Sequence, residues 1–584
     1  MKFLRVCRKV MRDEIVNLAK SQTMKYLPVL LLLSCTITAQ NPHPKNYFQK
    51  PLDIPLQLSG NFGELRSNHF HAGFDFRTQQ KEGLNVYAAA EGHVSRFKIS
   101  PYGYGKAVYI DHPNGYTTVY AHLQKFAPEI EAYLKNKQYE LQSFDVDIPV
   151  PAGALPVKGG QLIALSGNTG GSNGPHLHFE IRDTKTEKVI NPMFFGYDVL
   201  LPDSKKPHLN SLLVYPVDPT AAVNKALTPI VLDVRQESPG VYIAETVYAN
   251  GRIGFGINAA DKDDHSHSEN GLHAVSATFN GMPTYAYTFD TFHFDETRYI
   301  NALIDYPRFR QTSQRVQRLF RKKPFDLSII RTDLNGGVIT VTPNLSGTYR
   351  IVMEDYFGNK IEVNIPVVYA APPAFVAPTS SGFPVDASRE NIYEKNGVSV
   401  TFPAGTFYED FHLNFDVRNN QLFLDNRHVA VHSNFTVSIP EPSGYQGRNQ
   451  TFIALLDGNR KTYLQTSFRN GFYIAKAKAL GQFALERDTV NPTIKPVKNI
   501  AGKWISADRD LRFTIRDDLS GIKTIDGWLN GKWILFEYDY KNRRIVHDFS
   551  DGKHVEGRND LKIEVTDNVG NSAIFETHFF RATP

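Results

Sequence analysis

The sequence predicts a mainly β protein: an antiparallel β-sheet domain with a short inserted helix, followed by two or three Ig-like β-sandwich domains. Short runs of β-type residues recur between Gly, Asn and Pro turn signals along most of the chain, whereas residues 127–142 have helical spacing. The length agrees with this class, because 584 residues are enough for three or four cores of about 100 to 200 residues each.

The composition argues against a membrane-spanning segment and against a nucleic-acid partner. Hydrophobic residues make up 41% of the chain and charged residues 21%, and no apolar run approaches the length of about 20 residues that a membrane helix needs. The formal net charge of +5 is small for this length. We therefore expect a soluble mature chain with no transmembrane helix, and we do not expect nucleic acid as a partner.

Residues 1–39 resemble a signal peptide region. The apolar run "YLPVLLLLSCTITAQ" follows Met24-Lys25 and carries small residues just before Gln40, so we expect cleavage after Ala39 and a true start at Met24. A less favoured alternative is a lipid anchor on Cys35, because "LLSC" loosely resembles a lipobox. Both interpretations predict an exported protein of the periplasm or cell envelope.

Both cysteines, Cys7 and Cys35, lie in this N-terminal region. A mature chain without it has no thiol, although exported proteins often use disulfides. We therefore expect any metal site to be built from His and carboxylate side chains.

The first domain is predicted over residues 45–204. Its strand-like runs include "HVSRFKI", "AVYIDH", "TTVYAHL", "QLIALSG" and "HLHFEIRD". Within residues 127–142, Ile130, Tyr133 and Leu134 recur at helical spacing with charged residues between them. We expect this short amphipathic helix to lie between strands, where it would shape a groove beside a site.

The rest of the chain repeats one hairpin pattern. "GTYRIVMEDYFGNKIEVNIPV" and "DLKIEVTDNVGNSAIFETHFF" each place Asp-x-x-Gly-Asn between two alternating strands, with Asp and Asn bonding the local backbone and Gly accepting positive φ. This repeat predicts at least two β-sandwich modules. With linkers at Pro-bearing stretches, we expect a β-sandwich domain at 205–374, a β-rich domain at 375–487 and an Ig-like β-sandwich at 488–584.

Histidines gather in three strand-like segments of the first domain, "HFHAGFDFRT" (69–78), "TTVYAHLQ" (117–124) and "NGPHLHFEI" (173–181). In a strand, residues two apart share a face, so His176 and His178 point the same way, about 7 Å apart. Two imidazoles so placed are poor joint ligands for one ion with bonds of about 2.0 to 2.1 Å. One ligand and one neighbouring group is the more natural division.

His71 and Asp75 lie four residues apart, which is about 13 Å on a straight strand. A bend at Gly73 would bring them together. A His, Asp, His set with an open position for water is what catalytic zinc requires. The remaining histidines, His122 and His176, would then serve as general base and as stabiliser of a developing oxyanion.

Four motifs carry a resemblance to a known family. "HAGFDF", "VYAAAEGHV", "YGYGKAVYIDHPNGYTTVYAHL" and "GQLIALSGNTGGSNGPHLHFEI" look like the successive motifs of the lysostaphin/LytM-type zinc metallopeptidases, which are peptidoglycan endopeptidases. The resemblance covers roughly residues 60–195 in the family's order. It implies an antiparallel β-sheet zinc peptidase domain.

The resemblance also implies a role for each matched residue. One Zn²⁺ per catalytic domain would be held by His71, Asp75 and His178, with a water completing the shell. His122 and His176 would orient that water and stabilise the tetrahedral intermediate. All five positions are present, unlike in family members that have lost ligands and act only as activators of other hydrolases.

The cleft is where this sequence departs from the family pattern. Tyr102, Tyr104 and Asn168 lie in loops that resemble the family's cleft walls and are candidate substrate-binding residues. His69, beside His71, is treated as a neighbour of the site. About 35 residues, including the predicted helix, follow Leu123 where the family connection is short, which leaves the peptide preference open.

We therefore expect an exported zinc endopeptidase that hydrolyses peptide cross-links of peptidoglycan, with peptidoglycan peptides as partners and envelope proteins as partners of the C-terminal β modules. One alternative is a non-catalytic envelope scaffold or activator that binds peptidoglycan or a partner hydrolase; another is an enzyme that cleaves a protein target. The acidic stretch "DKDDHSHSEN" (261–270) is interpreted as a solvated loop rather than a calcium loop, and the basic run "RVQRLFRKKP" (315–324) as an exposed helix face.

Overall fold

The computed structural model describes residues 42–265, 268–323, 325, 327–373, 381–444 and 446–582. The predicted signal region, with Cys35, lies outside these residues. The chain divides into two compact units, Met1–Lys45 and Asn46–Pro584, and the description below concerns the second. In the part of the chain that the structure describes, no helix is both long and apolar enough to cross a membrane.

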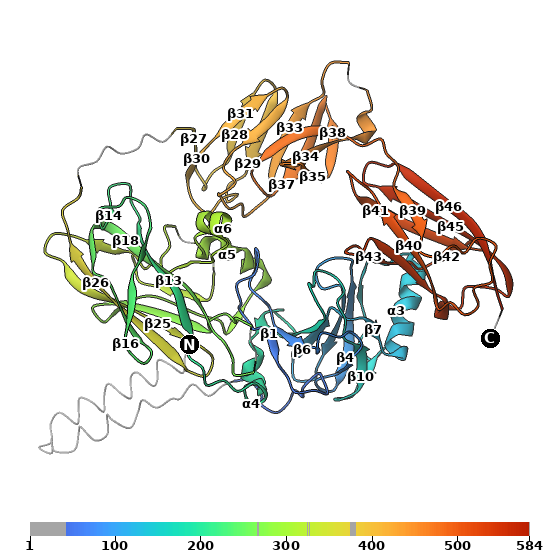
Figure 1. Cartoon of the computed structure of the whole chain (residues 1–584), viewed down its shortest axis with the longest axis horizontal. Helices are drawn as coiled ribbons and strands as arrows, with labels where there is room; N and C mark the ends of the chain where they lie inside the picture. Colours follow the sequence, from blue (N-terminus) through green and yellow to red (C-terminus); the bar gives the residue numbers. More distant parts are fainter. Residues whose placement is uncertain are drawn as a thin grey trace, which may run out of the picture. The chain divides into compact units, whose positions relative to one another are not determined.

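An antiparallel sheet is the frame of the first domain (Figure 1). Its strands alternate inward apolar residues with outward polar ones, as the sequence pattern predicts. The neighbouring strands, in order, are β1 (Leu58–Gly60), β2 (Phe74–Arg77), β11 (His176–Asp183), β6 (Tyr116–Ala121), β5 (Lys106–Asp111), β4 (Gly92–Ile99) and β8 (Val146–Pro149). A small sheet of β3 (Asn85–Tyr87), β10 (Leu162–Leu165) and β7 (Lys125–Phe126) completes the domain.

The central strand β11 is anchored by its apolar face. Leu177, Phe179 and Ile181 are fully buried, and the Phe179 ring lies 5.4 Å from the Tyr120 ring. Burying each such side chain contributes about 1.5 to 3 kcal/mol. The intervening residues of β11 therefore point to the opposite face, and these include both histidines of His-Leu-His.

The predicted inserted helix is confirmed as α3 (Pro128–Leu141). Pro128 occupies the first turn, where its missing N–H costs nothing, and the helix ends at Gln142 in a left-handed conformation with φ 48°. Ile130 and Leu134 are buried, and the Tyr133 ring stacks 6.2 Å from the Phe97 ring of β4. The helix thus packs on the domain core.

The chain continues into a second module built on a 13-stranded sheet. One strand of this part of the chain, β21 (Thr291–Phe292), pairs instead with β12 (Val189–Ile190) of the first domain and so extends the sheet of that domain. The 13-stranded sheet is mixed rather than antiparallel throughout, because β26 (Lys360–Tyr369) runs parallel to β17 (Val241–Ala244) and to part of β18 (Val247–Ala260). Its main path is β15 (Ile230–Leu232), β13 (His208–Pro216), β18 (Val247–Ala260), β26 (Lys360–Tyr369), β25 (Ser346–Glu354), β19 (Ala274–Phe279), β20 (Met282–Thr288) and β23 (Ile330–Thr332).

Two further pairs of sheets follow in sequence. Residues 391–487 form one pair, and residues 493–581 form another. The first pair is β28 (Asn391–Lys395), β29 (Val398–Phe402), β33 (Phe435–Pro440), β37 (Phe472–Ala477), β36 (Thr466–Arg469), facing β31 (Phe415–Arg418), β32 (Gln421–Leu424), β38 (Gln482–Arg487), β34 (Thr451–Asp457), β35 (Arg460–Tyr463). The second is β39 (Thr493–Pro496), β40 (Asp510–Arg516), β44 (Arg544–Asp548), β43 (Glu537–Asp539), with β42 (Lys532–Ile534), β41 (Ile522–Leu529), β45 (Gly557–Asp567), β46 (Ser572–Arg581).

The mainly β class is therefore confirmed, while the individual domain boundaries stay predictions. The repeated hairpins are present: Gly358 joins β25 to β26 with φ 84°, and Gly570 joins β45 to β46 with φ 96°. The interpretation of residues 315–324 as a helix face is wrong. That segment contributes a short strand, β22 (Gln317–Arg318), and Leu319 is fully buried in the core.

Candidate active site

The histidine-bearing segments of the first domain meet in one cleft. The cleft has a volume of about 1330 Å³ and is lined by residues of β2, β11, the loop after β6 and the loops around residues 66 and 103. Five predicted residues line it together, namely His71, Asp75, His122, His176 and His178. Segments that are about 100 residues apart in the sequence are joined here because β11 pairs with both β2 and β6.

Three side-chain atoms converge at the base of the cleft. His71 Nε2 lies 3.1 Å from Asp75 Oδ1 and 3.1 Å from His178 Nδ1, and His178 Nδ1 lies 2.9 Å from Asp75 Oδ1. Tetrahedral ligands with bonds of about 2.0 to 2.1 Å to one zinc ion would lie about 3.3 Å apart. The donor set of two imidazole nitrogens and one carboxylate oxygen therefore fits zinc in chemistry and in spacing.

The outer ring nitrogens of the two histidines are both held. His71 Nδ1 lies 2.7 Å from the Asn61 carbonyl oxygen, and His178 Nε2 lies 2.8 Å from Glu180 Oε1. Each outer nitrogen donates its hydrogen to an oxygen, so the inner nitrogen is the one that gives up its proton when a metal binds. Both rings are thus oriented to present the inner nitrogen as the ligand atom.

The third member, Asp75, is kept ionised. Burial alone would raise the pKa of Asp75, but attraction to His71 and hydrogen bonds from the surrounding histidines hold it well below its usual range. The other carboxylate oxygen, Oδ2, accepts a hydrogen bond of 2.9 Å from Arg66. Asp75 Oδ1 therefore remains directed at the two histidines.

Gly73 explains how His71 and Asp75 come together. A Cβ added to Gly73 would lie 2.1 Å from the Phe179 carbonyl oxygen, so only glycine allows this backbone to approach β11 so closely. β2 begins only at Phe74, so His71 lies outside the strand and is not bound by the spacing of a straight strand. The φ of Gly73 is not in the left-handed region, so glycine is required here by the close approach rather than by φ.

The two remaining histidines lie beside the three ligand atoms. The His122 and His176 rings are 4.7 Å apart, and His176 Nε2 lies 3.4 Å from Asp75 Oδ1. His122 Nδ1 donates to the Thr169 carbonyl at 2.9 Å, and His176 Nδ1 donates to the Gly174 carbonyl at 2.9 Å. Each Nε2 is left for the cleft, where it can accept or donate a proton.

Burial and neighbouring positive charge shape the behaviour of His122. They lower its pKa to about 3, with burial the larger cause and His176 and His178 the next. His122 also adopts a left-handed conformation with φ 59°, which is unusual for a residue with a side chain and typical of functional sites. A neutral His122 is thus available as a base at neutral pH.

Glu180 was missed by the sequence analysis. It is fully buried, accepts a hydrogen bond from Tyr104, and pairs with Arg182 Nη2 at 2.6 Å. Burial would raise the pKa of Glu180, but Arg182 and His178 lower it to about 2. Its spacing could have predicted this contact, because Glu180 lies two residues after His178 and therefore points to the same face of β11.

The predicted substrate-binding residues lie in different surroundings. Tyr102 and Tyr104 line the cleft, and Tyr102 is 56% exposed with its ring 4.7 Å from the Tyr540 ring. Asn168 does not line the cleft; its carbonyl accepts a hydrogen bond from Lys541. His69 lines the cleft but contacts the Ser67 carbonyl, so the structure does not bring it to the three ligand atoms.

Comparisons with known proteins agree with this geometry. Peptidase family M23 matches residues 69–139 and 147–192, and a Zu5-like domain matches residues 384–488. The M23 match contains all five predicted residues of the cleft and breaks at the end of α3.

Curated relatives match the same region. The DD-carboxypeptidase/endopeptidase Mpg of Neisseria meningitidis is 37% identical over 134 residues, which are 22% of this chain and 25% of that protein. The peptidoglycan DD-endopeptidase ShyA of Vibrio cholerae is 35% identical over 141 residues, or 23% of this chain and 27% of that protein. The chain thus spans about a quarter of the length of these relatives.

Among solved structures, a zinc containing peptidase from Vibrio cholerae is 30% identical and covers 26% of this chain and 40% of that chain, with a TM-score of 0.19. The matched region is thus similar to metallopeptidases of the lysostaphin/LytM type, the resemblance that the sequence motifs predicted. The similarity to peptidase family M23 extends over residues 69–139 and 147–192.

Proposed function

We propose that this chain is an exported, zinc-dependent endopeptidase that hydrolyses peptide cross-links of peptidoglycan. The observation that carries the proposal is the convergence of His71 Nε2, Asp75 Oδ1 and His178 Nδ1 within 3.1 Å of one another, at the base of an open cleft. Relatives named as peptidoglycan DD-endopeptidases match this region and suggest the substrate.

When bound to these three atoms, Zn²⁺ would supply a Lewis acid and lower the pKa of a water molecule. The residues of the chain would do the rest. His122, neutral because its pKa is depressed, would accept the proton of the attacking water through Nε2. His176, whose Nδ1 donates to the Gly174 carbonyl, would act in its doubly protonated form and stabilise the oxygen of the cleaved peptide bond by donating from Nε2 as that oxygen gains charge.

The shape of the cleft supports a peptide substrate. The cleft is open to solvent over about 1330 Å³ and is lined by both polar side chains and the aromatic residues Tyr102 and Tyr104. An extended peptide can lie in such a groove with its scissile bond over the three ligand atoms. The exposed Tyr102 ring and the cleft-facing Tyr104 would contact it on one side.

The experiment is digestion of purified sacculi by the zinc-loaded chain, with soluble products mapped by mass spectrometry and zinc measured per chain. Release of uncrosslinked peptides, abolished by a chelator and restored by zinc, is the expected result. Binding to sacculi without turnover would instead support the non-catalytic scaffold. Cleavage of other proteins but not of sacculi would reject the substrate while keeping the peptidase.

A further inference from the structure

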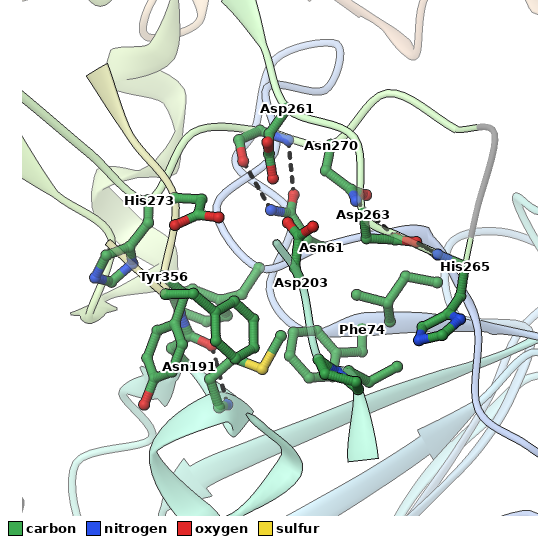
Figure 2. Close-up of a pocket in the computed structure, with 18 of the residues that line it drawn as sticks. Asn61, Phe74, Asn191, Asp203, Asp261, Asp263, His265, Asn270, His273 and Tyr356 are labelled. Atoms are coloured by element: carbon green, nitrogen blue, oxygen red, sulfur yellow. Dashed lines mark hydrogen bonds between the residues drawn. The ribbon is translucent and has the colours of Figure 1, made fainter. Parts of the chain in front are cut away.

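A second cluster of metal-binding side chains lies where the second module packs against the first domain, outside the three ligand atoms of the peptidase cleft. Asp203, Asp261 and Asp355 each offer a carboxylate oxygen within 4.8 Å of the other two. Asp203 lies in the segment that enters the module, Asp261 follows β18, and Asp355 follows β25. In Figure 2, the Asp261 side chain points toward Asp203.

The three carboxylates have no close cationic partner, although Asp355 lies near enough to His273 to oppose the fall in the pKa of His273 that burial causes. Among the described residues, no Lys, Arg or His side chain forms an ion pair with any of them. Burial and repulsion between the acids raise the pKa of Asp261 to about 7 and that of Asp203 to about 6. Like charges held this close in a buried site are unfavourable unless a cation joins them.

Two buried oxygens at the cluster also have no hydrogen-bond donor. Asp261 Oδ1 and the amide oxygen of Asn270 are both unpartnered, although each residue is only 5% exposed. The two residues face each other through a pair of backbone hydrogen bonds of 2.9 Å. A buried acceptor without a hydrogen-bond donor destabilises the fold by about 1 to 3 kcal/mol. A cation bound to these two oxygens would remove that cost.

A small cavity lies at these residues. It has a volume of about 40 Å³, and its lining includes Asp203, Asp261, Asn270 and Asp355 together with apolar side chains of the first domain such as Phe62, Phe74 and Met193. This volume has room for one ion with a water or two, because a water molecule needs at least about 10 to 15 Å³. The earlier interpretation of residues 261–270 as a solvated loop is wrong for its two ends, since Asp261 and Asn270 are buried.

The C-terminal module provides an internal comparison. Asp488, Asp517 and Asp567 form the matching cluster there, at the module entrance, after β40 and in the Asp-x-x-Gly-Asn turn. The frameworks are alike: Asn571 Nδ2 donates to the Asp488 carbonyl and to Asp567 Oδ2. In the second module, Asn359 Nδ2 makes the same two contacts with Asp203 and Asp355.

The two clusters differ in how their acids are compensated. In the C-terminal cluster, Asp517 Oδ2 accepts two backbone N–H bonds, Asp567 Oδ1 accepts three, and both oxygens of Asp488 accept one each. In the second module, Asp203 Oδ1 accepts one from Lys205, Asp355 Oδ1 accepts one from Asn359, and Asp261 Oδ1 accepts none. The same framework is satisfied by backbone amides in one module and left with unmet acceptors in the other.

We propose that Asp203, Asp261 and Asp355, with the amide oxygen of Asn270, form a Ca²⁺ site. Carboxylate and amide oxygens are the ligands that calcium prefers, and none of these four residues offers the imidazole or thiolate that zinc favours, although His265 and His273 line the same cavity. Calcium also tolerates irregular oxygen geometry better than magnesium does. The proposal of this site does not rest on the proposed peptidase activity.

The test uses the full zinc-loaded chain, titrated with CaCl₂ by calorimetry and followed by thermal unfolding. We expect one calcium ion per chain, a rise in Tm with calcium, and binding of MgCl₂ weaker by about tenfold or more. Asp261→Asn replaces the carboxylate by an amide of the same shape and should remove the calcium-dependent rise in Tm. Asp517→Asn, the equivalent change in the C-terminal cluster, should leave that rise unchanged.

A folded wild-type chain with neither heat of binding nor a Tm shift at about 10 mM CaCl₂, well above the range of weak calcium modules, would overturn the proposal. So would an unchanged calcium response in Asp261→Asn, or its loss in Asp517→Asn. If Asp261→Asn fails to fold, Asp203→Asn provides the same test, because Asp203 is only partly buried. Equal affinity for magnesium would reject calcium as the selected ion.

Discussion

His178 and Glu180 are joined across two residues of β11 by a 2.8 Å hydrogen bond from the outer ring nitrogen, Nε2, to Oε1. The opposite nitrogen, Nδ1, is thereby turned to His71 and Asp75. Glu180 is in turn held by the buried Arg182. The orientation of a candidate zinc ligand thus depends on a carboxylate that does not face the zinc.

Substitution of Glu180 should weaken zinc binding. In Glu180→Ala, His178 loses the acceptor that fixes its tautomer, and we expect zinc affinity to fall by about 10- to 100-fold. Competition with a chromophoric chelator measures this. Glu180→Gln keeps an oxygen acceptor and should lose less. Unchanged zinc affinity in a folded Glu180→Ala chain would contradict the proposed positioning role.

The contact between Asn61 and Gly271 leads to a second prediction. The Asn61 carbonyl accepts from His71, while its side-chain amide makes two 2.8 Å hydrogen bonds with the backbone of Gly271. Asn61→Ala removes those two bonds and leaves the carbonyl, so the loop that holds His71 should loosen. Two hydrogen bonds contribute about 2 kcal/mol, and only part of that loss is transmitted to His71, so we expect zinc affinity to fall by a few fold.

The matched control for Asn61→Ala is Asn85→Ala, which removes an exposed hydrogen bond in the same domain. That variant should bind zinc as the wild type does. Equal zinc affinity in Asn61→Ala and Asn85→Ala would show that the Gly271 contact has no influence on His71.

The sequence was informative where chemistry follows local spacing. Alternation along β11 was enough to separate His178 from the core residues Leu177 and Phe179, because side chains in a strand alternate faces. Hydrogen-bond partners that come from the backbone of other segments could not be predicted, and the Asn61 carbonyl that accepts from His71 is an example. The helix expected at 315–324 was wrong because burial of Leu319 in the tertiary core overrode the local charge pattern.

The buried acids of the second module show the same limit. Asp261 and Asn270 stand in a stretch whose composition is typical of a solvated loop. Their burial comes from contact with residues far away in sequence, including Asp203 and Asp355. Composition cannot reveal such a cluster, because each member alone looks like a turn residue.

Close packing at Gly73 predicts a large effect on stability. A Cβ in Gly73→Ala would meet the Phe179 carbonyl at 2.1 Å, so β2 and β11 would have to separate. We expect the free energy of unfolding to fall by at least about 1 to 3 kcal/mol, as for other overpacked sites. Denaturant unfolding measures this. Gly174→Ala, whose Cβ would meet no atom within 4 Å, is the control and should be near neutral.

The metal-free protein should lose stability at alkaline pH. Although burial opposes it, hydrogen bonds to Asp75 and Glu180 raise the pKa of His178 to about 9 in the folded state, above the ordinary value of about 6.5. This group therefore stabilises the fold fully below about pH 6.5, and the contribution is lost as the pH rises through about 9. Tm should fall over this interval in chelator-treated protein.

Zinc-loaded protein provides the comparison, because a ligated His178 Nδ1 carries no proton that can be lost. Its Tm should change less between pH 6.5 and 9 than that of the chelated protein. Parallel curves for the two forms would contradict the assignment of His178 as a metal ligand.

Variants of His122 and His178 should separate chemistry from metal binding. His122 is not one of the three ligand atoms, so His122→Ala should keep zinc while turnover of sacculi falls by about 10²- to 10⁴-fold, the usual worth of a positioned general base. His178→Ala should lose both zinc and activity. The acidic limb of the pH–rate profile should also disappear in His122→Ala if this residue is the base, since a neutral imidazole is then no longer required. Loss of zinc from His122→Ala would mean that it supports the metal site, and unchanged turnover in both variants would reject the catalytic assignment.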